Sequence, residues 1–167
     1  MSFLETLLYL VTLFAALGCG IMAGLFYAFS NFVMKALAQI PAPSGIAAMQ
    51  AINVTVLNPL FLAIFLSTAA ACGILVIYAL ISLQTPGSYC LLAAGLLYLL
   101  GNVLVTMVFN VPRNNALARL DAASTEAAGF WGDYVVTWTR WNHVRTVTAM
   151  VALVLLIIGL WRVKSMG

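Results

Sequence analysis

The chain has 167 residues, of which 65% are hydrophobic and only 7% are charged. An ordinary soluble domain is about one quarter charged, so this composition excludes a soluble globular fold and makes membrane lipid the solvent for most of the chain. The seven Lys and Arg residues give a formal net charge of +3 without forming a basic run, which argues against nucleic acid as a partner.

Apolar segments long enough to cross a bilayer occur four times along the chain. No Asp, Glu, Lys, Arg or His occurs between residues 36 and 112, and a helix needs about 20 apolar residues to cross the hydrocarbon core. We therefore predict an all-α protein, a polytopic membrane four-helix bundle that forms a single transmembrane domain over residues 1–167. The predicted spans cover residues 3–34, 47–81, 89–111 and 141–161.

Small residues and prolines mark the first three spans. The first span ends just before Lys35, and its Gly20 and Gly24 offer a face on which another helix can pack closely, within the chain or in a homo-oligomer. The second span is interrupted or kinked near Pro59, because proline lacks the amide hydrogen. The third ends at Pro112, because the residue before a proline disfavours the helical conformation.

The segment between the third and fourth spans, residues 113–136, is the most polar part of the chain. It is predicted to be an extramembrane loop that is partly helical. Only 16 residues separate Arg145 from Arg162, which is about 24 Å of helix and less than the thickness of the hydrocarbon core. Arg145 and His143 are therefore expected at or just inside the membrane boundary.

Strongly polar side chains gather near one end of the predicted bundle, beside several aromatic residues. Amides and charges are costly in lipid unless they pair or face a wet cavity. The sequence therefore predicts a pocket for a small aromatic or quinone-like ligand, although the asparagines could instead hydrogen-bond one another across helices. The predicted ligand-binding residues are Tyr27, Asn31, Asn53, Asn58, Asn102, Asn110, Asn114, Trp138, Trp141 and Thr146.

The chain offers few side chains that bind metals. It has one histidine, and Cys19, Cys72 and Cys90 show no Cys-x-x-Cys spacing, so these cysteines are expected to be small buried residues. The sequence also lacks a phosphate-binding loop, a dinucleotide fingerprint and a serine nucleophile elbow. We therefore expect no metal and no cofactor.

Two sequence motifs resemble the anthrone-oxygenase-like family of small four-span membrane proteins. They are NVPRNNAL at residues 110–117 and WTRWNHVRT at residues 138–146, and the similarity covers nearly the full chain. The resemblance implies a reaction in which dioxygen converts an anthrone into an anthraquinone without metal or flavin. Arg113 stands where an aliphatic residue is expected in the family, so the charge of this pocket is expected to differ from that of its relatives.

The resemblance also suggests catalytic roles, and the predicted catalytic residues are His143, Arg145 and Asn142. His143 is the candidate base that removes an acidic C–H next to a carbonyl, because histidine titrates near neutrality. Arg145, Asn142 and Asn114 would stabilise a phenolate-like oxygen. Trp141 would stack on the ring. His143 lies about 100° from Asn142 around the helix, so an orientation toward lipid headgroups stays open.

Two interpretations of the function follow. In the first, the protein is a cofactor-free oxygenase whose partners are membrane lipid, a small aromatic or quinone-like ligand and dioxygen. In the second, it is a non-catalytic accessory protein, carrier or scaffold whose polar cluster locks the bundle. In either case the expected location is the bacterial inner membrane, which the chain crosses several times.

Overall fold

The computed structural model describes the backbone of residues 2–164 and the side chains of residues 2–162. This part of the chain is helical apart from short connections and has no strand, which confirms the all-α prediction. In chain order the elements are α1 (Phe3–Ala28), the π-helical segment η1 (Phe29–Val33), α2 (Met34–Gln39), α3 (Ala42–Thr55), α4 (Pro59–Ile81), α5 (Ser88–Tyr98), the π-helical segments η2 (Leu99–Leu104) and η3 (Thr106–Asn110), α6 (Val111–Ala118) and α7 (Thr125–Lys164).

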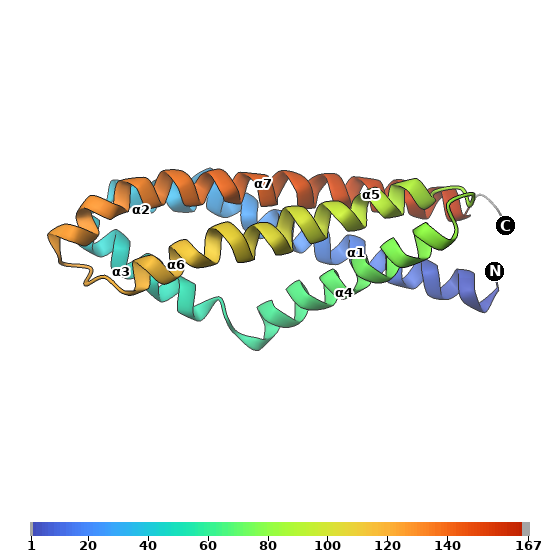
Figure 1. Cartoon of the computed structure of the whole chain (residues 1–167), viewed down its shortest axis with the longest axis horizontal. Helices are drawn as coiled ribbons and strands as arrows, with labels where there is room; N and C mark the ends of the chain where they lie inside the picture. Colours follow the sequence, from blue (N-terminus) through green and yellow to red (C-terminus); the bar gives the residue numbers. More distant parts are fainter. Residues whose placement is uncertain (1, 165–167) are drawn as a thin grey trace.

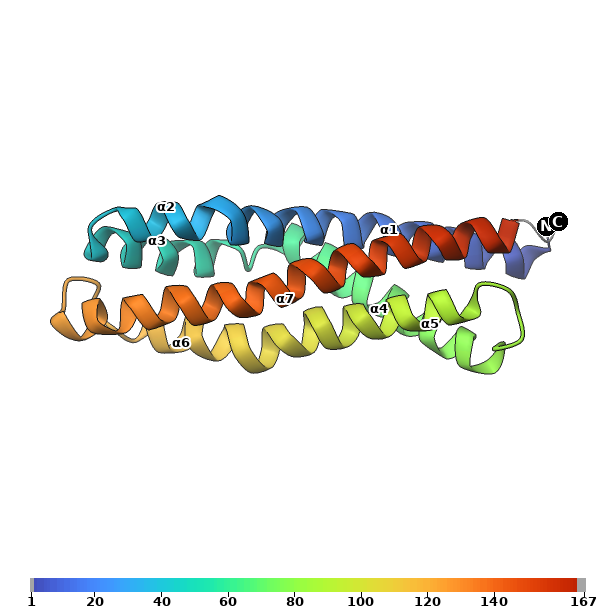
Figure 2. The same cartoon turned by 90° about the horizontal axis from the view of Figure 1, so that it is seen from above.

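Four continuous helical stretches are long and apolar enough to cross a membrane, so the chain is a multi-pass membrane protein. They are Phe3–Gln39, Pro59–Ile81, Ser88–Ala118 and Thr125–Arg162. Neighbours in this series are antiparallel (Figures 1 and 2). The start of α1, the α4–α5 connection and the last turns of α7 lie at one end of the molecule, and the α2–α3 and α6–α7 connections lie at the other.

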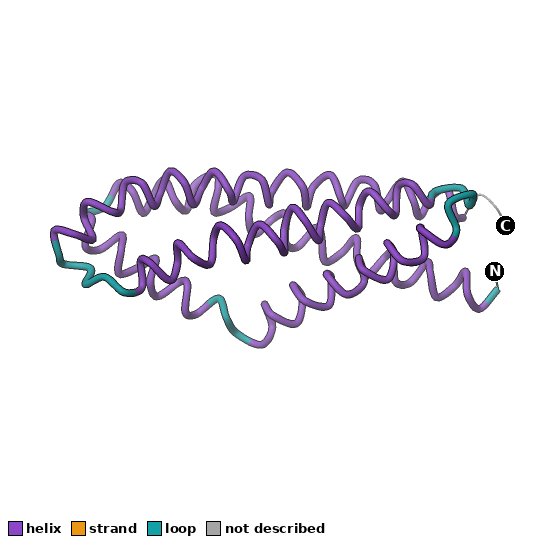
Figure 3. The backbone as a smooth tube through the Cα atoms, in the orientation of Figure 1, coloured by secondary structure: helices purple, strands orange, loops and turns teal. Residues whose placement is uncertain are grey.

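The third and fourth spans are longer than predicted, and residues 113–136 do not form a loop. The helix of the third span runs on through Pro112 to Ala118, and only residues 119–124 separate α6 from α7 (Figure 3). Pro112 comes directly after the π-helical segment η3, so the residues before it do not keep the regular α-helical hydrogen bonds that a proline disrupts. Ser124 starts α7 by accepting a hydrogen bond from the amide of Ala127 at 3.1 Å, as a helix N-cap does.

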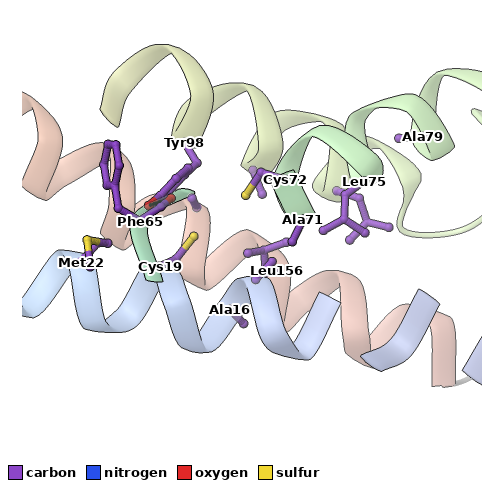
Figure 4. Packing of buried hydrophobic residues seen from close by; sticks show 14 of the residues in the cluster. Ala16, Cys19, Met22, Phe65, Ala71, Cys72, Leu75, Ala79, Tyr98 and Leu156 are labelled. Atoms are coloured by element: carbon purple, nitrogen blue, oxygen red, sulfur yellow. Dashed lines mark hydrogen bonds between the residues drawn. The ribbon is translucent and has the colours of Figure 1, made fainter. Parts of the chain in front are cut away.

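An apolar core holds the helices together at the end where α4 meets α5. Figure 4 shows Cys19 of α1, Cys72 of α4 and Leu156 of α7 within it, and both cysteines are free thiols that are fully buried. The Tyr98 hydroxyl donates a hydrogen bond to the carbonyl oxygen of Phe65 at 3.3 Å, so the polar atom of this large side chain is satisfied within the core.

A second core lies at the other end, where α2, α3, α6 and α7 meet. It is built from sulfur-containing, aliphatic and aromatic side chains, namely Met34, Ile46, Met49, Leu117, Ala127, Trp131, Tyr134 and Trp138. Between the two cores α4 leaves the bundle, and the chain turns sharply at the α3–α4 connection (Figure 1). The candidate site lies beside this turn.

Candidate functional site

A cavity of about 290 Å³ lies between η1, α3, the α3–α4 connection, α6 and α7. Its wall is mainly apolar, with a few polar groups from α3, η3, α6 and α7. No Asp, Glu or His is among the described residues that line it. The lining residues are Leu25, Phe26, Phe29, Met49, Gln50, Ile52, Asn53, Val54, Val56, Leu57, Phe61, Thr106, Asn110, Val111, Asn114, Asn115, Ala118, Trp138 and Arg145.

The cavity exists because the chain breaks between α3 and α4 and α4 then diverges from the bundle. Asn58 makes this corner: its Oδ1 accepts a hydrogen bond from the amide of Phe61 at 3.0 Å, and its Nδ2 donates one to the carbonyl of Thr55 at 3.0 Å. Pro59 follows in the first helical turn, a favoured position for proline. Asn58 is therefore a helix cap that shapes the cavity without lining it.

Arg145 is the one charged side chain among the described residues that line the cavity. Only 6% of it is exposed. Its Nη1 donates a hydrogen bond to Thr106 Oγ1 at 3.2 Å and its Nη2 donates one to Asn142 Oδ1 at 2.6 Å. No described carboxylate forms an ion pair with Arg145, so its guanidinium is held by neutral groups. A buried charge without a counter-charge is costly.

Aromatic rings surround the guanidinium. Its central carbon lies 4.3 Å from the centre of the Phe26 ring and 5.3 Å from the centre of the Trp138 ring. Ring faces attract cations at such distances, by about 2 kcal/mol or less for each contact. The two contacts offset part of the cost of burying the charge, while the cation still borders the cavity.

Asn142 fixes Arg145 in place and belongs to the packing of α7 on α1. Its Nδ2 donates hydrogen bonds to the Phe26 carbonyl at 2.6 Å and to Ser30 Oγ at 2.7 Å, and its Oδ1 is taken by Arg145. Asn142 is fully buried and does not line the cavity. The geometry makes it a positioning residue for Arg145.

A second hydrogen-bond network fixes the aromatic wall. Asn114 Oδ1 accepts from Trp138 Nε1 at 2.8 Å and from the Tyr134 hydroxyl at 2.9 Å. Asn53 Nδ2 donates to the same hydroxyl at 3.3 Å. Asn53, Asn114 and Trp138 thus line the cavity as predicted, and they also tie α3, α6 and α7 together.

Two buried polar atoms of cavity-lining residues lack a hydrogen-bond partner among the described residues. They are Arg145 Nε, a donor, and Asn110 Oδ1, an acceptor. The amide nitrogen of Asn110 is satisfied, because it donates to the Trp138 carbonyl at 3.3 Å. Three buried atoms away from the cavity, Thr68 Oγ1, Asn102 Oδ1 and Thr139 Oγ1, also lack a partner among the described residues, so this feature is not specific to the cavity.

Several of the predicted site residues lie away from the cavity. Asn102 donates to Thr148 Oγ1 at 3.1 Å, and Trp141 stacks on Phe109 with ring centres 3.5 Å apart. The others that do not line it are Tyr27 and Asn31, which bond to each other at 3.1 Å, Thr146, which donates to the Asn142 carbonyl at 2.9 Å, and His143.

His143 is exposed and lines a separate groove between α2 and α7. It directly follows Asn142, and a step of one residue turns the side chain by about 100° around the helix. Because Asn142 points into the bundle, His143 points away from it. His143 therefore does not contact the cavity, and it is not positioned to act as the predicted base on a ligand there.

Arg113 does not set the charge of the cavity, contrary to the expectation from sequence. Its Nη1 lies 2.9 Å from Asp133 Oδ2, and both side chains are partly or largely exposed. The apolar wall of the cavity includes Phe26, Phe29 and Met49. These residues were not predicted as site residues from the sequence. Nothing distinguishes such residues from ordinary core residues until α4 is seen to diverge.

Metal-binding side chains do not come together in the part of the chain described here: no group of three or more His, Cys, Asp or Glu occurs among those residues. The polar groups that face the cavity are amides, a hydroxyl and one guanidinium. These groups suit an uncharged or anionic organic ligand, because they offer mainly hydrogen-bond donors and one positive charge.

These features define a class: an all-helical, multi-pass membrane protein with a small cavity that borders one buried arginine. Sequence comparison narrows the class to a family. The model of the anthrone oxygenase family matches residues 57–155, and the chain belongs to this family. The matched stretch holds Asn110, Asn114, Trp138, Asn142 and Arg145. Neither a curated protein nor a solved structure gave a significant match.

Proposed function

We propose that the cavity binds a planar aromatic ligand in its ionised form and promotes its oxidation by dioxygen, with an anthrone as the substrate class. Arg145 carries this proposal, because a buried cation without a counter-charge at the edge of an apolar cavity is suited to an oxyanion that arrives with the ligand. We place the protein in the inner membrane of a bacterium, where such an apolar substrate would dissolve.

The walls of the cavity support an aromatic ligand. Phe26, Phe29 and Trp138 offer ring surfaces and Met49 adds a polarisable side chain, which suits stacking and edge contacts with a flat ring system. The cavity volume of about 290 Å³ lies at the lower end of the range of about 300–1,000 Å³ for small-molecule sites. The largest ligand that we expect to fit in this volume has two or three fused rings.

The proposed reaction balances as follows. An anthrone loses a proton from the carbon opposite its carbonyl, which gives a delocalised anion whose oxygen faces Arg145. That anion passes one electron to dioxygen, and the two radicals combine to form a carbon–oxygen bond. Loss of the second proton from that carbon breaks the oxygen–oxygen bond. The products are the anthraquinone and one water.

The residues of the cavity stabilise the anion and do not supply a strong base. Arg145 would hold the oxyanion through its charge and its free Nε–H, and thereby favour ionisation of the bound anthrone. Asn110 Oδ1 would accept a hydrogen bond from a ring hydroxyl of the ligand. The proton passes to water, since the cavity wall has no carboxylate or imidazole among its described residues.

A scaffold or carrier without catalytic activity is the second candidate. The observation in its favour is that Asn142 bonds to α1 and η1 through its Nδ2, and Asn114 bonds to α7 through its Oδ1, as expected of groups that hold a bundle together. In that case the buried charge of Arg145 at the edge of the cavity would have no anion to bind.

The test is oxygen uptake by detergent-purified protein given emodin anthrone, corrected for autoxidation. Wild-type protein should accelerate uptake, and Arg145→Gln should lower the accelerated rate by about 10²–10³, the usual loss for one oxyanion-stabilising donor. Arg119→Gln is the matched control, because it removes one exposed positive charge outside the cavity. Uptake equal to autoxidation, or equal rates for the wild-type and Arg145→Gln proteins, would overturn the proposal and favour the scaffold.

A further inference from the structure

A second concave surface lies on the outside of the bundle, between α2 and α7. It is a groove of about 440 Å³, separate from the cavity around Arg145. Three of its lining residues are basic or titratable nitrogen groups, namely Lys35, Arg140 and His143. Nothing in the proposed oxygenase chemistry uses them.

The positive charges of this groove are free within the described part of the chain. Lys35, Arg140 and His143 are exposed, and none of them makes a hydrogen bond or ion pair to another described residue. No acidic residue lines the groove. Asp133, an acidic residue on the same helix, is already paired with Arg113. The groove is therefore a concave surface whose charged residues, Lys35 and Arg140, are both positive. Such a surface attracts anions.

The groove lies at the depth of lipid headgroups. Arg140 and Trp161 lie 21 residues apart on one continuous helix, which is about 31 Å. The hydrocarbon core is about 30 Å thick. Trp161 is 80% exposed, as tryptophans at the membrane–water boundary often are. With Trp161 at one boundary, Arg140 reaches the other.

Apart from the hydroxyls of Ser30 and Thr139, the rest of the groove is apolar. Met34, Ala38, Val135 and Val136 line it beside the basic residues, so a ligand there meets a charged part and a hydrocarbon part side by side. A free phosphate ion would use only the first part. A phospholipid would use both, since its phosphate and its first acyl carbons are joined in one molecule.

We propose that this groove is a binding site for an anionic phospholipid, whose phosphate lies between Lys35 and Arg140 and whose glycerol and upper acyl carbons cover the apolar residues. Two cations that converge on one phosphate give stronger binding than a single surface charge. Basic residues at the membrane boundary attract anionic lipids in general, and the groove adds shape to that attraction.

The proposal is tested by native mass spectrometry of the full-length protein in detergent, titrated with phosphatidylglycerol or with phosphatidylcholine of the same acyl chains. Wild-type protein should bind phosphatidylglycerol more tightly. Arg140→Gln should weaken that binding about fivefold, and Lys35→Gln with Arg140→Gln about 25-fold, which corresponds to the usual effect of each cation near an anionic lipid. Arg140→Lys should recover most of the loss, because it restores the charge.

Arg119→Gln is the matched control, since it removes an exposed positive charge that does not line the groove. It should leave the preference for phosphatidylglycerol unchanged. Equal affinity for the two lipids, or equal losses in Arg119→Gln and Arg140→Gln, would overturn the proposal. Displacement of the lipid by millimolar inorganic phosphate would overturn the choice of a lipid and make the groove a site for free phosphate.

Discussion

Replacing Arg145 with methionine distinguishes a binding role for this cation from a structural one. Methionine has a similar length and no charge, and it adapts its shape to irregular spaces. The substitution removes two hydrogen bonds, at 3.2 Å to Thr106 and 2.6 Å to Asn142. It also removes the cost of burying a charge that has no counter-charge among the described residues.

The two effects have similar size. Hydrogen bonds to charged groups contribute about 1.5–3 kcal/mol each, and the desolvation of one buried ion costs several kcal/mol. Replacement of buried ionic groups by apolar residues of similar volume is often neutral, or stabilising by about 1–4 kcal/mol. We therefore expect Arg145→Met to be at least as stable as the wild type. We expect Asn142→Leu to lose about 3–5 kcal/mol, because it removes one hydrogen bond to the charged Arg145 and two neutral ones to Phe26 and Ser30.

The assay is thermal unfolding in one detergent, followed by circular dichroism and by tryptophan fluorescence. For a chain of this size about 1 kcal/mol shifts the midpoint by about 2–4 °C. Asn142→Leu should therefore melt about 6–20 °C below the wild type, and Arg145→Met no lower than the wild type. A midpoint for Arg145→Met as low as that for Asn142→Leu would show that Arg145 holds the bundle together, and would refute the reasoning that its charge is kept for a ligand.

Three further predictions test the hydrogen-bond network of Asn114, the packing of α4 on α5 and the role of His143. Asn114→Leu should lower the free energy of unfolding by about 2–6 kcal/mol in chemical denaturation, because two buried donors lose their acceptor, whereas a loss below 1 kcal/mol would contradict the network. Gly95→Ala should destabilise the α4–α5 contact, since an added methyl carbon would lie 2.8 Å from the Cys72 carbonyl oxygen; Gly73→Ala, which meets no atom within 4 Å, should be neutral or stabilising by about 1 kcal/mol. His143→Ala should leave oxygen uptake with emodin anthrone unchanged, and a large loss would restore His143 as a catalytic candidate.

The sequence was sufficient to predict the helical class and the four spans, because a charge-free stretch of this length has only one physical solution, burial in lipid. It missed the early start of α7, because the polar residues at 113–136 were read as a loop. A buried stripe with spacings of three and four residues runs through the whole helix. Its members are Ala127, Trp131, Tyr134, Trp138, Asn142, Arg145, Ala149, Ala152 and Leu156, and following it back from Trp138 would have predicted the helix.

The third span departs from regular α-helical geometry, which makes its side-chain directions hard to predict. The helix between Leu99 and Asn110 contains two π-helical segments, in which hydrogen bonds join residues five apart instead of four. If every residue is assumed to turn the helix by 100°, the predicted directions of the side chains after the first π-helical segment are therefore wrong. Asn102 consequently bonds to Thr148, whereas Asn110 borders the cavity. No single-sequence pattern reports such wide turns.

Some of the predicted site residues lie together around the cavity. Asn53, Asn110, Asn114, Trp138 and Arg145 line the cavity and could be chosen from sequence because polar groups at one end of a bundle tend to converge. The shape and the apolar wall of the cavity could not be predicted, because they depend on the divergence of α4 after a helix cap. The sequence around Asn58 predicts a helix cap, but it does not predict the angle between α3 and α4.

The most direct test of the central claim, that Arg145 stabilises an aromatic oxyanion in the cavity, is the absorption spectrum of a bound hydroxyanthraquinone. Ionised phenols absorb at longer wavelength than neutral ones. At a pH where the free dye is neutral, wild-type protein should show the band of the ionised dye, because the buried guanidinium favours the anion. Arg145→Gln should bind the dye with its neutral spectrum. A neutral spectrum with the wild type, or the same ionised band with both proteins, would contradict the claim.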